Sequence, residues 1–136
     1  MLVLLRGQTA ENVDIQLVVS DDIVIFADKQ KIQQVFINLL KNSFQALTDG
    51  GIIRIRAWQH QTELKITVSD NGPGIPRQVQ KKIFDPFFTT KDTGQGSGLG
   101  LFIVHDIIIQ HGGSISIEST GEGTAFIIRL PGEEVS

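Results

Sequence analysis

A glycine-rich segment that leads directly into an apolar helix constrains this chain more than any other feature. The segment reads Gly-Gln-Gly-Ser-Gly-Leu-Gly-Leu at 94–101, with glycine at every second position from Gly94 to Gly100. Glycine leaves room for a large ligand and adopts positive φ values at little cost. The apolar run that follows predicts a helix from about Gly98 to His111, whose first backbone N–H groups are unpaired and carry the positive end of the helix dipole. Such an arrangement is typical of a phosphate-binding site, although a glycine-rich loop can equally be a structural turn.

Length and composition indicate one globular domain. The chain has 136 residues, of which 40% are hydrophobic and 20% charged, and its formal net charge is −3. These values are typical of a soluble protein with a single core. The negative charge argues against a broad nucleic-acid-binding surface, and the absence of cysteine excludes disulfides and thiolate metal sites. Because we recognise neither a membrane-spanning apolar run nor a signal peptide, we expect a cytoplasmic domain that contacts neither nucleic acid nor membrane.

Hydrophobic periodicity divides the chain into strands and helices. Alternating apolar and polar residues predict strands at 14–19, 23–27, 52–58, 63–69, 114–119 and 124–130. The first two, the middle two and the last two of these strands are each expected to form a hairpin. Helical spacing predicts a long helix from Lys29 to about Leu47, capped by Asp28, and a short helix at 77–83. Residues 1–13 are either an N-terminal strand or the remnant of a linker, and residues 14–136 form the domain itself.

A stripe of side-chain amides borders the buried face of the long helix. Its members lie three or four residues apart, which places them along one line of the helix: Gln34, Asn38, Asn42 and Gln45. A solvated polar edge is the ordinary explanation of such residues. Asparagine is a mediocre helix former, however, so two asparagines in mid-helix indicate a further role at a site.

An acidic residue followed by two glycines ends the strand at 63–69. The sequence Asp-Asn-Gly-Pro-Gly at 70–74 is compatible with a simple tight turn, because these residue types are common in turns. The alternative is a pocket for a heterocyclic base. There the carboxylate of Asp70 would accept a hydrogen bond from an exocyclic amine, and Gly72 and Gly74 would let a flat ring approach the backbone. The long segment at 85–97 is typical of a lid over a site.

Four motifs occur in a fixed order along the chain. They are an asparagine box at 38–43, a first glycine box at 70–74, a phenylalanine box at 84–87 and a second glycine box at 96–101. This set resembles the ATP-binding domain of the GHKL superfamily, which includes DNA gyrase, the ninety-kilodalton heat-shock chaperone, histidine kinases and MutL. Within it, the chain looks like the catalytic and ATP-binding domain of a bacterial sensor histidine kinase. The sequence Phe-Phe-Thr-Thr-Lys at 87–91 is most similar to that of nitrogen-regulation and sporulation kinases.

The resemblance implies a fold and two bound species. The fold is α+β, a two-layer sandwich with a mixed, mostly antiparallel sheet of about five strands, about three helices on one face and a mobile ATP lid. The bound species are ATP and Mg²⁺. Asn42 would ligate Mg²⁺ through its amide oxygen, and Asn38 would lie beside the phosphates. Lys91 would contact a phosphate from the lid, so Asn38 and Lys91 are the residues expected to assist the reaction.

The same resemblance implies the remaining nucleotide contacts. Asp70 would bind the adenine amino group, and Thr124 would reach the adenine through a water molecule. The ring would be lined by Gly72, Gly74 and Ile75. The phosphates would be held by the second glycine box and the start of the next helix, at Gly96, Ser97, Gly98, Leu99, Gly100 and Leu101. Gln45 stands where many relatives carry a phosphate-binding lysine.

The residue at position 38 bears on the reaction. ATPases of the superfamily place a glutamate four residues before the metal-binding asparagine, whereas this chain has Asn38, which cannot act as a base. The resemblance therefore implies transfer of the γ-phosphoryl group to a histidine on a separate dimerisation domain, and then to the receiver domain of a response regulator. The chain's own histidines lack the acid-rich helical setting of a phosphoacceptor and are expected to be structural: His60, His105 and His111.

Two other functions are compatible with the sequence. One is that of a GHKL serine kinase of the anti-sigma type, and the other is that of a nucleotide-binding sensor without catalysis. Phosphohistidine is labile in acid and phosphoserine is not, so acid stability of the product distinguishes the two kinases. Transfer of label from γ-labelled ATP to any partner excludes the pure sensor.

Overall fold

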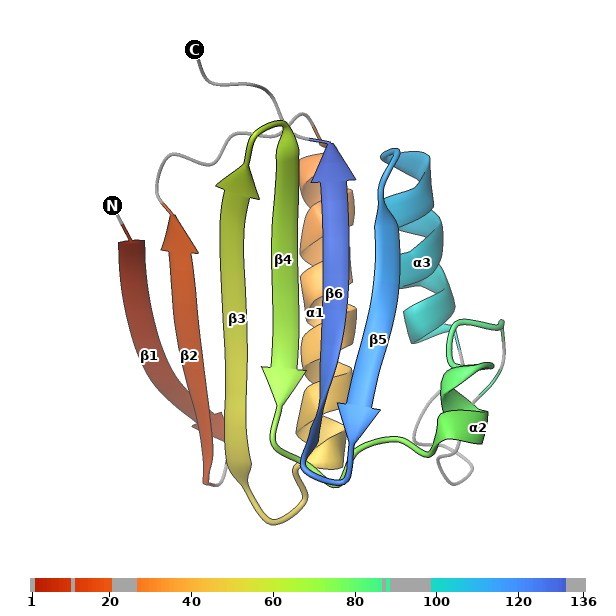
Figure 1. The fold of residues 1–136 in the computed structure, drawn as a ribbon. Helices are drawn as coiled ribbons and strands as arrows, with labels where there is room; N and C mark the ends of the chain where they lie inside the picture. The colour runs from red at the N-terminus through yellow and green to blue at the C-terminus, as the bar shows by residue number, and fades with distance from the viewer. Residues whose placement is uncertain (1, 11, 21–26, 87, 89–98, 132–136) are drawn as a thin grey trace.

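Six strands form one sheet in the computed structural model, which describes residues 2–10, 12–20, 27–86, 88 and 99–131 (Figure 1). The strands are β1 Leu2–Ala10, β2 Val13–Ser20, β3 Gly51–His60, β4 Glu63–Asp70, β5 Ser114–Thr120 and β6 Gly123–Pro131. Their order across the sheet is β1-β2-β3-β4-β6-β5. Strands β2 and β3 are parallel, and the other neighbouring pairs are antiparallel. The sheet is therefore mixed and mostly antiparallel, as predicted.

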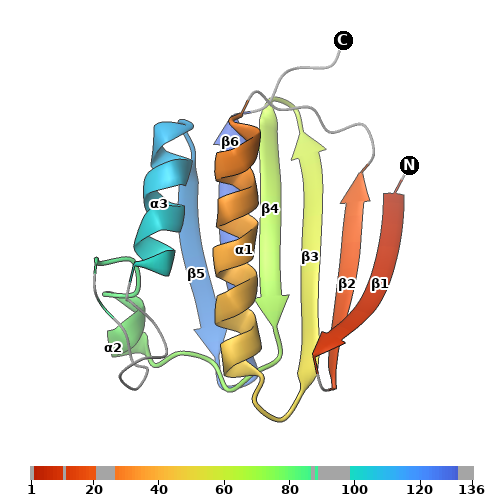
Figure 2. The same ribbon diagram turned by 180° about the vertical axis from the view of Figure 1, so that it is seen from behind.

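Helices cover one face of this sheet (Figure 2). The long helix α1 (Lys29–Ala46) and the helix α3 (Gly100–Gln110) lie side by side on that face, and the short helix α2 (Arg77–Gln80) lies near the N-terminal end of α3. This two-layer arrangement confirms the predicted α+β sandwich. None of these helices, in the part of the chain that the structure describes, is both long enough and apolar enough to span a membrane.

The start of α1 confirms the predicted cap. The Oδ1 atom of Asp28 accepts hydrogen bonds from the backbone N–H groups of Gln30 and Lys31, at 3.0 and 3.2 Å. Two of the four N–H groups that a helix leaves unpaired are thereby satisfied. The cap sets where the helix begins and hence which of its residues face the sheet.

The core lies between the helices and the sheet. Alternate residues of β3 and β4 point into it, as the period of two predicts. The fully buried apolar side chains come from α1, α3, β2, β3, β4 and β6: Val13, Val35, Leu39, Ile53, Leu64, Val68, Val104, Ile108, Phe126 and Ile128. This packing holds the C-terminal half of α1 beside the turn that follows β4, where the candidate site lies.

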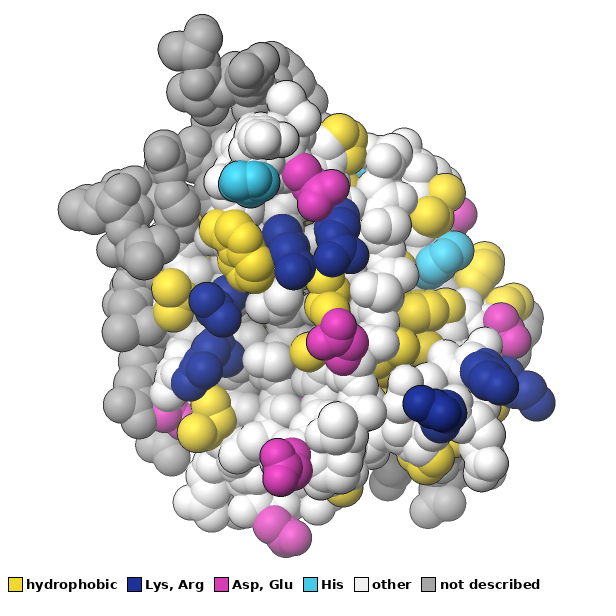
Figure 3. All heavy atoms as spheres, in the orientation of Figure 1, with side chains coloured by type: hydrophobic (Ala, Val, Ile, Leu, Met, Phe, Trp, Pro, Cys, Tyr) yellow, Lys and Arg dark blue, Asp and Glu magenta, His cyan; other side chains and the backbone are white. Residues whose placement is uncertain are grey.

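The opposite face of the sheet is open and carries basic side chains. The charged groups of Arg56 and Lys65 each lie 5.3 Å from the ring centroid of Trp58. Arg129 Nε lies 3.6 Å from Glu63 Oε1. Figure 3 shows Lys and Arg side chains gathered over the middle strands of this face. The aromatic and acidic neighbours offset part of the repulsion between these cations.

The N-terminal pairing differs from the sequence prediction. The sheet has six strands rather than about five, because Leu2–Ala10 form β1. The hairpin expected between 14–19 and 23–27 is wrong, since β2 pairs with β1 along one edge and with β3 along the other. Residues 23–26 lie outside the described part of the chain. The division of the chain into 1–13 and 14–136 stays a prediction.

Candidate functional site

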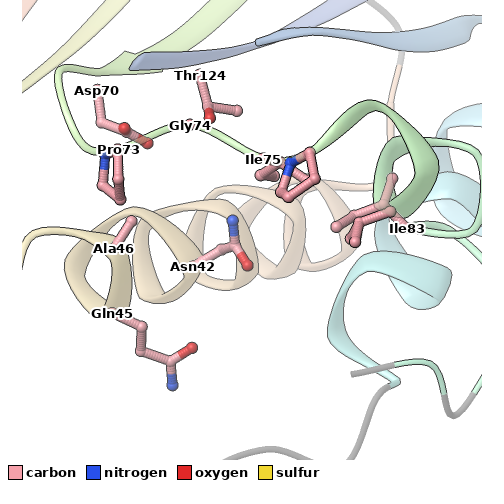
Figure 4. Close-up of a pocket in the computed structure, with 11 residues that line it drawn as sticks. Asn42, Gln45, Ala46, Asp70, Pro73, Gly74, Ile75, Ile83 and Thr124 are labelled. Atoms are coloured by element: carbon pink, nitrogen blue, oxygen red, sulfur yellow. The ribbon is translucent and has the colours of Figure 1, made fainter. Parts of the chain in front are cut away.

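A cavity of about 370 Å³ opens between α1, the turn after β4, and α2 (Figure 4). It is lined by Asn42, Gln45, Ala46, Asp70, Pro73, Gly74, Ile75, Pro76, Val79, Ile83 and Thr124. Most of this lining is apolar, and a few polar side chains converge on it from α1, β4 and β6. A concave, largely apolar site with few polar groups is typical of a pocket for a small molecule.

Asp70 is the charged group of this cavity. It is the last residue of β4 and only 8% of its surface is exposed. Its Oδ1 atom accepts a hydrogen bond from Gly72 N at 3.0 Å, whereas Oδ2 is buried and has no hydrogen-bond partner among the described residues. Burial raises the pKa of the Asp70 carboxyl above its ordinary value. The Gly72 N–H, the Ser43 hydroxyl and the Thr124 N–H oppose this effect, although the Ser43 hydroxyl lies near the carboxyl without the geometry of a hydrogen bond. A buried acceptor without a partner is expected where a ligand supplies the donor.

Thr124 is held by a serine that the sequence analysis missed. Ser119 Oγ lies 2.8 Å from Thr124 Oγ1 and accepts a hydrogen bond from Ile75 N at 2.7 Å. This serine joins β5 to the two cavity-lining residues. A signal for it exists in the alternation of β5, because Ser119 shares a strand face with Ile115 and Ile117, which pack on the core. A serine on that face is a polar residue in an apolar row.

The two glycines after Asp70 serve backbone packing. Gly74 has φ of +82°, and a Cβ placed on it would overlap the carbonyl oxygen of Thr120. A Cβ on Gly72 would lie 3.3 Å from the carbonyl oxygen of Ala46 in α1. These glycines therefore let the turn fit between α1 and the β5–β6 hairpin. Gly74 also lines the cavity, so its contact with a flat ring stays a prediction, as does that of Gly72.

The amide stripe of α1 divides into two parts. Asn42 lines the cavity, while Gln45 is exposed at its edge, and its amide points away from Asp70 in Figure 4. Farther along the helix, Asn38 Nδ2 donates a hydrogen bond of 3.2 Å to the carbonyl oxygen of Gly100. Gln34 Nε2 donates a bond of 3.0 Å to Asn38 Oδ1. Asn38 is thus a contact between helices rather than part of a solvated edge.

The structure brings together only part of the predicted phosphate site. Leu99 is the N-cap residue of α3, and Gly100 and Leu101 form its first turn. Leu101 packs on the core. The other predicted phosphate contacts lie outside the described residues: Lys91, Gly96, Ser97 and Gly98. Most of the expected lid at 85–97 lies outside them as well.

The cavity lies in a domain of a known family. The family model described as "Histidine kinase-, DNA gyrase B-, and HSP90-like ATPase" matches residues 27–134, which include the cavity and the start of α3. The chain belongs to this family. The matched range contains all four of the motifs found in the sequence.

Individual relatives are histidine kinases. The chain is 43% identical over 112 residues to Sporulation kinase A of Bacillus subtilis, a match that covers 82% of the chain and 18% of that kinase. It is 46% identical over 109 residues to the signal transduction histidine-protein kinase AtoS of Escherichia coli, covering 79% of the chain and 18% of AtoS. The solved catalytic domain of the histidine kinase ThkA matches with a TM-score of 0.79 and 39% identity, over 89% of this chain and 80% of that one. The chain thus spans less than a fifth of the length of these two curated relatives.

The histidines of this ATPase-family domain make internal contacts or lie on the surface. His111 Nε2 accepts a hydrogen bond from Asp28 N at 3.1 Å, and its Nδ1 lies 2.8 Å from the carbonyl oxygen of Ile107. With Nε2 as the acceptor, Nδ1 is the nitrogen placed to donate to the carbonyl oxygen of Ile107. His105 packs against Phe84 with ring centroids 5.6 Å apart, and His60 is exposed at the end of β3.

The side chains around the cavity fit a metal ion that is coordinated mainly by the phosphates of a bound small molecule. Among the described residues, no group of three or more His, Cys, Asp or Glu side chains could hold a metal ion. The cavity offers instead the amide of Asn42. Mg²⁺ prefers oxygen ligands and commonly binds through one or two protein groups together with substrate phosphates. The residues present therefore fit Mg²⁺ delivered with a phosphate ligand.

Proposed function

We propose that the chain is the catalytic domain of a sensor histidine kinase. It binds MgATP and donates the γ-phosphoryl group to a histidine on a separate dimerisation domain, from which the receiver domain of a response regulator takes it. The observation that carries this proposal is the buried Oδ2 of Asp70, which has no partner among the residues that the structure describes and lies in a cavity that Asn42 also lines. The names of the relatives support histidine as the acceptor. The proposed place of the reaction is the cytoplasm, where ATP is available.

Adenine suits the cavity by its chemistry. The ring is flat and largely apolar, and Ala46, Ile75 and Ile83 offer an apolar lining. Its exocyclic amino group is a hydrogen-bond donor, and Oδ2 of Asp70 has no donor among the described residues. A hydrogen bond to a carboxylate in a desolvated site is stronger than one between neutral groups. Binding of adenine therefore removes the cost of an unpaired buried acceptor.

The triphosphate is expected to extend from the cavity toward α3. Asn42 lines the cavity, and Asn38, one turn earlier in α1, contacts Gly100 at the start of α3. The first N–H groups and the dipole of α3 favour an anion at that point. Mg²⁺ held by Asn42 and the phosphates would neutralise charge on the transferred phosphoryl group and on the ADP that leaves. Lys91, Gly96, Ser97 and Gly98 stay predicted phosphate contacts.

Transfer to another domain is favoured over hydrolysis. An ATPase needs a base to activate water, and the amide of Asn38 cannot accept a proton at neutral pH. Its oxygen accepts a hydrogen bond from Gln34 and its nitrogen donates one to Gly100. Phosphoryl transfer asks a protein mainly for positioning and charge neutralisation. This domain would supply both, and the partner domain would supply the nucleophile.

The test measures ATP binding first and transfer second. We expect the chain to bind ATP in the presence of Mg²⁺, and Asp70→Asn to weaken binding by at least about tenfold, because the amide presents a donor to the adenine amine. Ser116→Ala is the matched control, since Ser116 is exposed on β5 away from the cavity and should leave binding unchanged. Equal ATP affinity in Asp70→Asn and the unmodified chain would contradict the adenine site.

The second measurement identifies the acceptor. With the kinase's own dimerisation domain and γ-labelled ATP, we expect label on that domain that is lost in acid and retained in alkali. Label that survives acid would indicate a serine kinase of the anti-sigma type. Binding of ATP without label on any partner would indicate a nucleotide sensor.

A further inference from the structure

The hydroxyl oxygen of Ser119 meets three polar groups around the cavity wall. It accepts a hydrogen bond from Ile75 N at 2.7 Å and donates one to the carbonyl oxygen of Gly123 at 3.2 Å. It also lies 2.8 Å from Thr124 Oγ1, where either oxygen could supply the proton. Ser119 is not itself part of the cavity lining, whereas Ile75 and Thr124 are.

The number of protons available fixes which oxygen donates in the contact between Ser119 and Thr124. A serine hydroxyl has one proton to donate and two lone pairs that accept. The carbonyl of Gly123 can only accept, so it takes the proton of Ser119. Ile75 N–H takes one lone pair, and Thr124 must then donate its own proton to the other. Only this arrangement satisfies all three contacts at once.

This arrangement leaves the Thr124 hydroxyl able to accept a hydrogen bond from a ligand but not to donate one. Thr124 is 5% exposed and lines the cavity, and its Oγ points toward the cavity in Figure 4. With its proton given to Ser119, its oxygen presents lone pairs alone. Asp70 Oδ2 likewise presents an acceptor that has no partner in the described part of the chain. These two side chains thus offer the base two acceptors and no donor.

We propose that Ser119 is a positioning residue that determines base specificity: by fixing the Thr124 hydroxyl as an acceptor, it selects a 6-aminopurine over a 6-oxopurine. This inference rests on the proposed function, in which ATP fills the cavity. An amino group donates hydrogen bonds directly to these acceptors. A carbonyl at the same position meets acceptors only and leaves buried groups unpaired, which is a strong basis for discrimination.

Inosine triphosphate is the probe, because it differs from ATP only in the oxo group at position 6 and the proton on N1. We expect the unmodified chain to bind ATP more tightly than inosine triphosphate, with both affinities measured by calorimetry in Mg²⁺. In Ser119→Ala the Thr124 hydroxyl is free to turn and donate, so the ratio of the two affinities falls by about fivefold, the scale of one neutral hydrogen bond. Ser119→Thr keeps the hydroxyl and restores the ratio. Ser116→Ala, the same change at an exposed serine of β5, leaves it unchanged.

A double-mutant cycle separates this role from a structural one. Thr124→Val removes the acceptor that Ser119 is proposed to orient, so adding Ser119→Ala to Thr124→Val should leave the affinity ratio unchanged. If Ser119→Ala weakens ATP and inosine triphosphate equally, or lowers the ratio by the same factor in both backgrounds, the specificity role is overturned. Thermal unfolding of each variant establishes that the compared chains are folded. Failure of the unmodified chain to bind either nucleotide would instead overturn the proposed function.

Discussion

The side-chain amide of Asn38 in α1 donates a hydrogen bond of 3.2 Å to the carbonyl oxygen of Gly100, the first residue of α3. The two residues are 62 positions apart in the chain. With Gln34 bonded to its oxygen, both polar atoms of the Asn38 amide have partners inside the protein. The asparagine box and the end of the second glycine box thus meet directly.

The first prediction concerns Asn38→Ala. The variant loses two hydrogen bonds but gains helix propensity, so its free energy of unfolding should change by less than about 1 kcal/mol. Phosphoryl transfer from MgATP should fall on the order of 100-fold, the usual effect of removing one group that stabilises transition-state charge. Chemical denaturation and labelling with γ-labelled ATP measure the two effects. Gln34→Ala, which removes one of the same contacts, should keep transfer within about threefold; a large loss there would show that the network rather than Asn38 matters.

A second prediction concerns Gly74→Ala. The new Cβ would overlap the carbonyl oxygen of Thr120, and φ of +82° is strained for any residue with a side chain. We expect a loss of about 3 kcal/mol in the free energy of unfolding without nucleotide. Urea denaturation of the nucleotide-free chain is the measurement.

Gly100→Ala is the matched comparison for that substitution. The nearest atom to its new Cβ is Asn38 Cγ at 3.9 Å, an ordinary contact. Because alanine is the better helix former, stability should be unchanged or rise by up to about 1 kcal/mol. Equal destabilisation by the two substitutions would contradict the assignment of Gly74 to backbone packing.

A third prediction concerns stability and pH at Asp70. Burial raises the pKa of this carboxyl above its ordinary value of 3.8, so the charged form costs more in the folded state than in the unfolded chain. The protonated carboxyl contributes to the free energy of unfolding. This contribution is fully present at pH values below the ordinary pKa and is lost as the pH rises through the pKa of the folded state. Asp70→Asn should therefore be more stable than the unmodified chain at neutral pH, by on the order of 1 kcal/mol, while it binds ATP less well.

The pH profile of thermal unfolding measures this effect. The stability difference between Asp70→Asn and the unmodified chain should grow from pH 4 to pH 7. A difference that shrinks over this range would mean that protein groups already stabilise the carboxylate in the folded state. That result would contradict the proposal that Oδ2 accepts a hydrogen bond from the ligand.

The fourth prediction concerns metal dependence. We expect removal of Mg²⁺ by EDTA to weaken ATP binding by the unmodified chain. In Asn42→Ala, ATP affinities with and without Mg²⁺ should become nearly equal. The affinity for MgATP should fall by about tenfold or more, and the affinity for metal-free ATP should change little. Gln45→Ala is the comparison on the same helix edge, since its amide points away from Asp70. An unaltered Mg²⁺ effect in Asn42→Ala would place the metal elsewhere.

The elements with a regular apolar pattern were predictable from the sequence. The helix α1 begins after Asp28 and ends within one residue of the predicted position, because its cap and its period are local properties. The strands β3 and β4 likewise have the alternation that the sequence displays. The acidic turn and the amide stripe were recognised as a site because their residue types are costly in a helix or a buried strand end unless a ligand or a partner requires them.

Sequence alone thus determined most of the local elements, and the family resemblance of its motifs implied the α+β class and the side chains Asn42, Asp70 and Thr124, which line one cavity. Only the tertiary structure decided that β2 lies between β1 and β3, that Gly74 makes room for Thr120 and that Ser119 orients Thr124. The physical reason is the range of the interactions. Caps and periodicity act within a few residues, whereas strand pairing, close backbone packing and the direction of a hydroxyl proton depend on groups that meet only when the chain has folded.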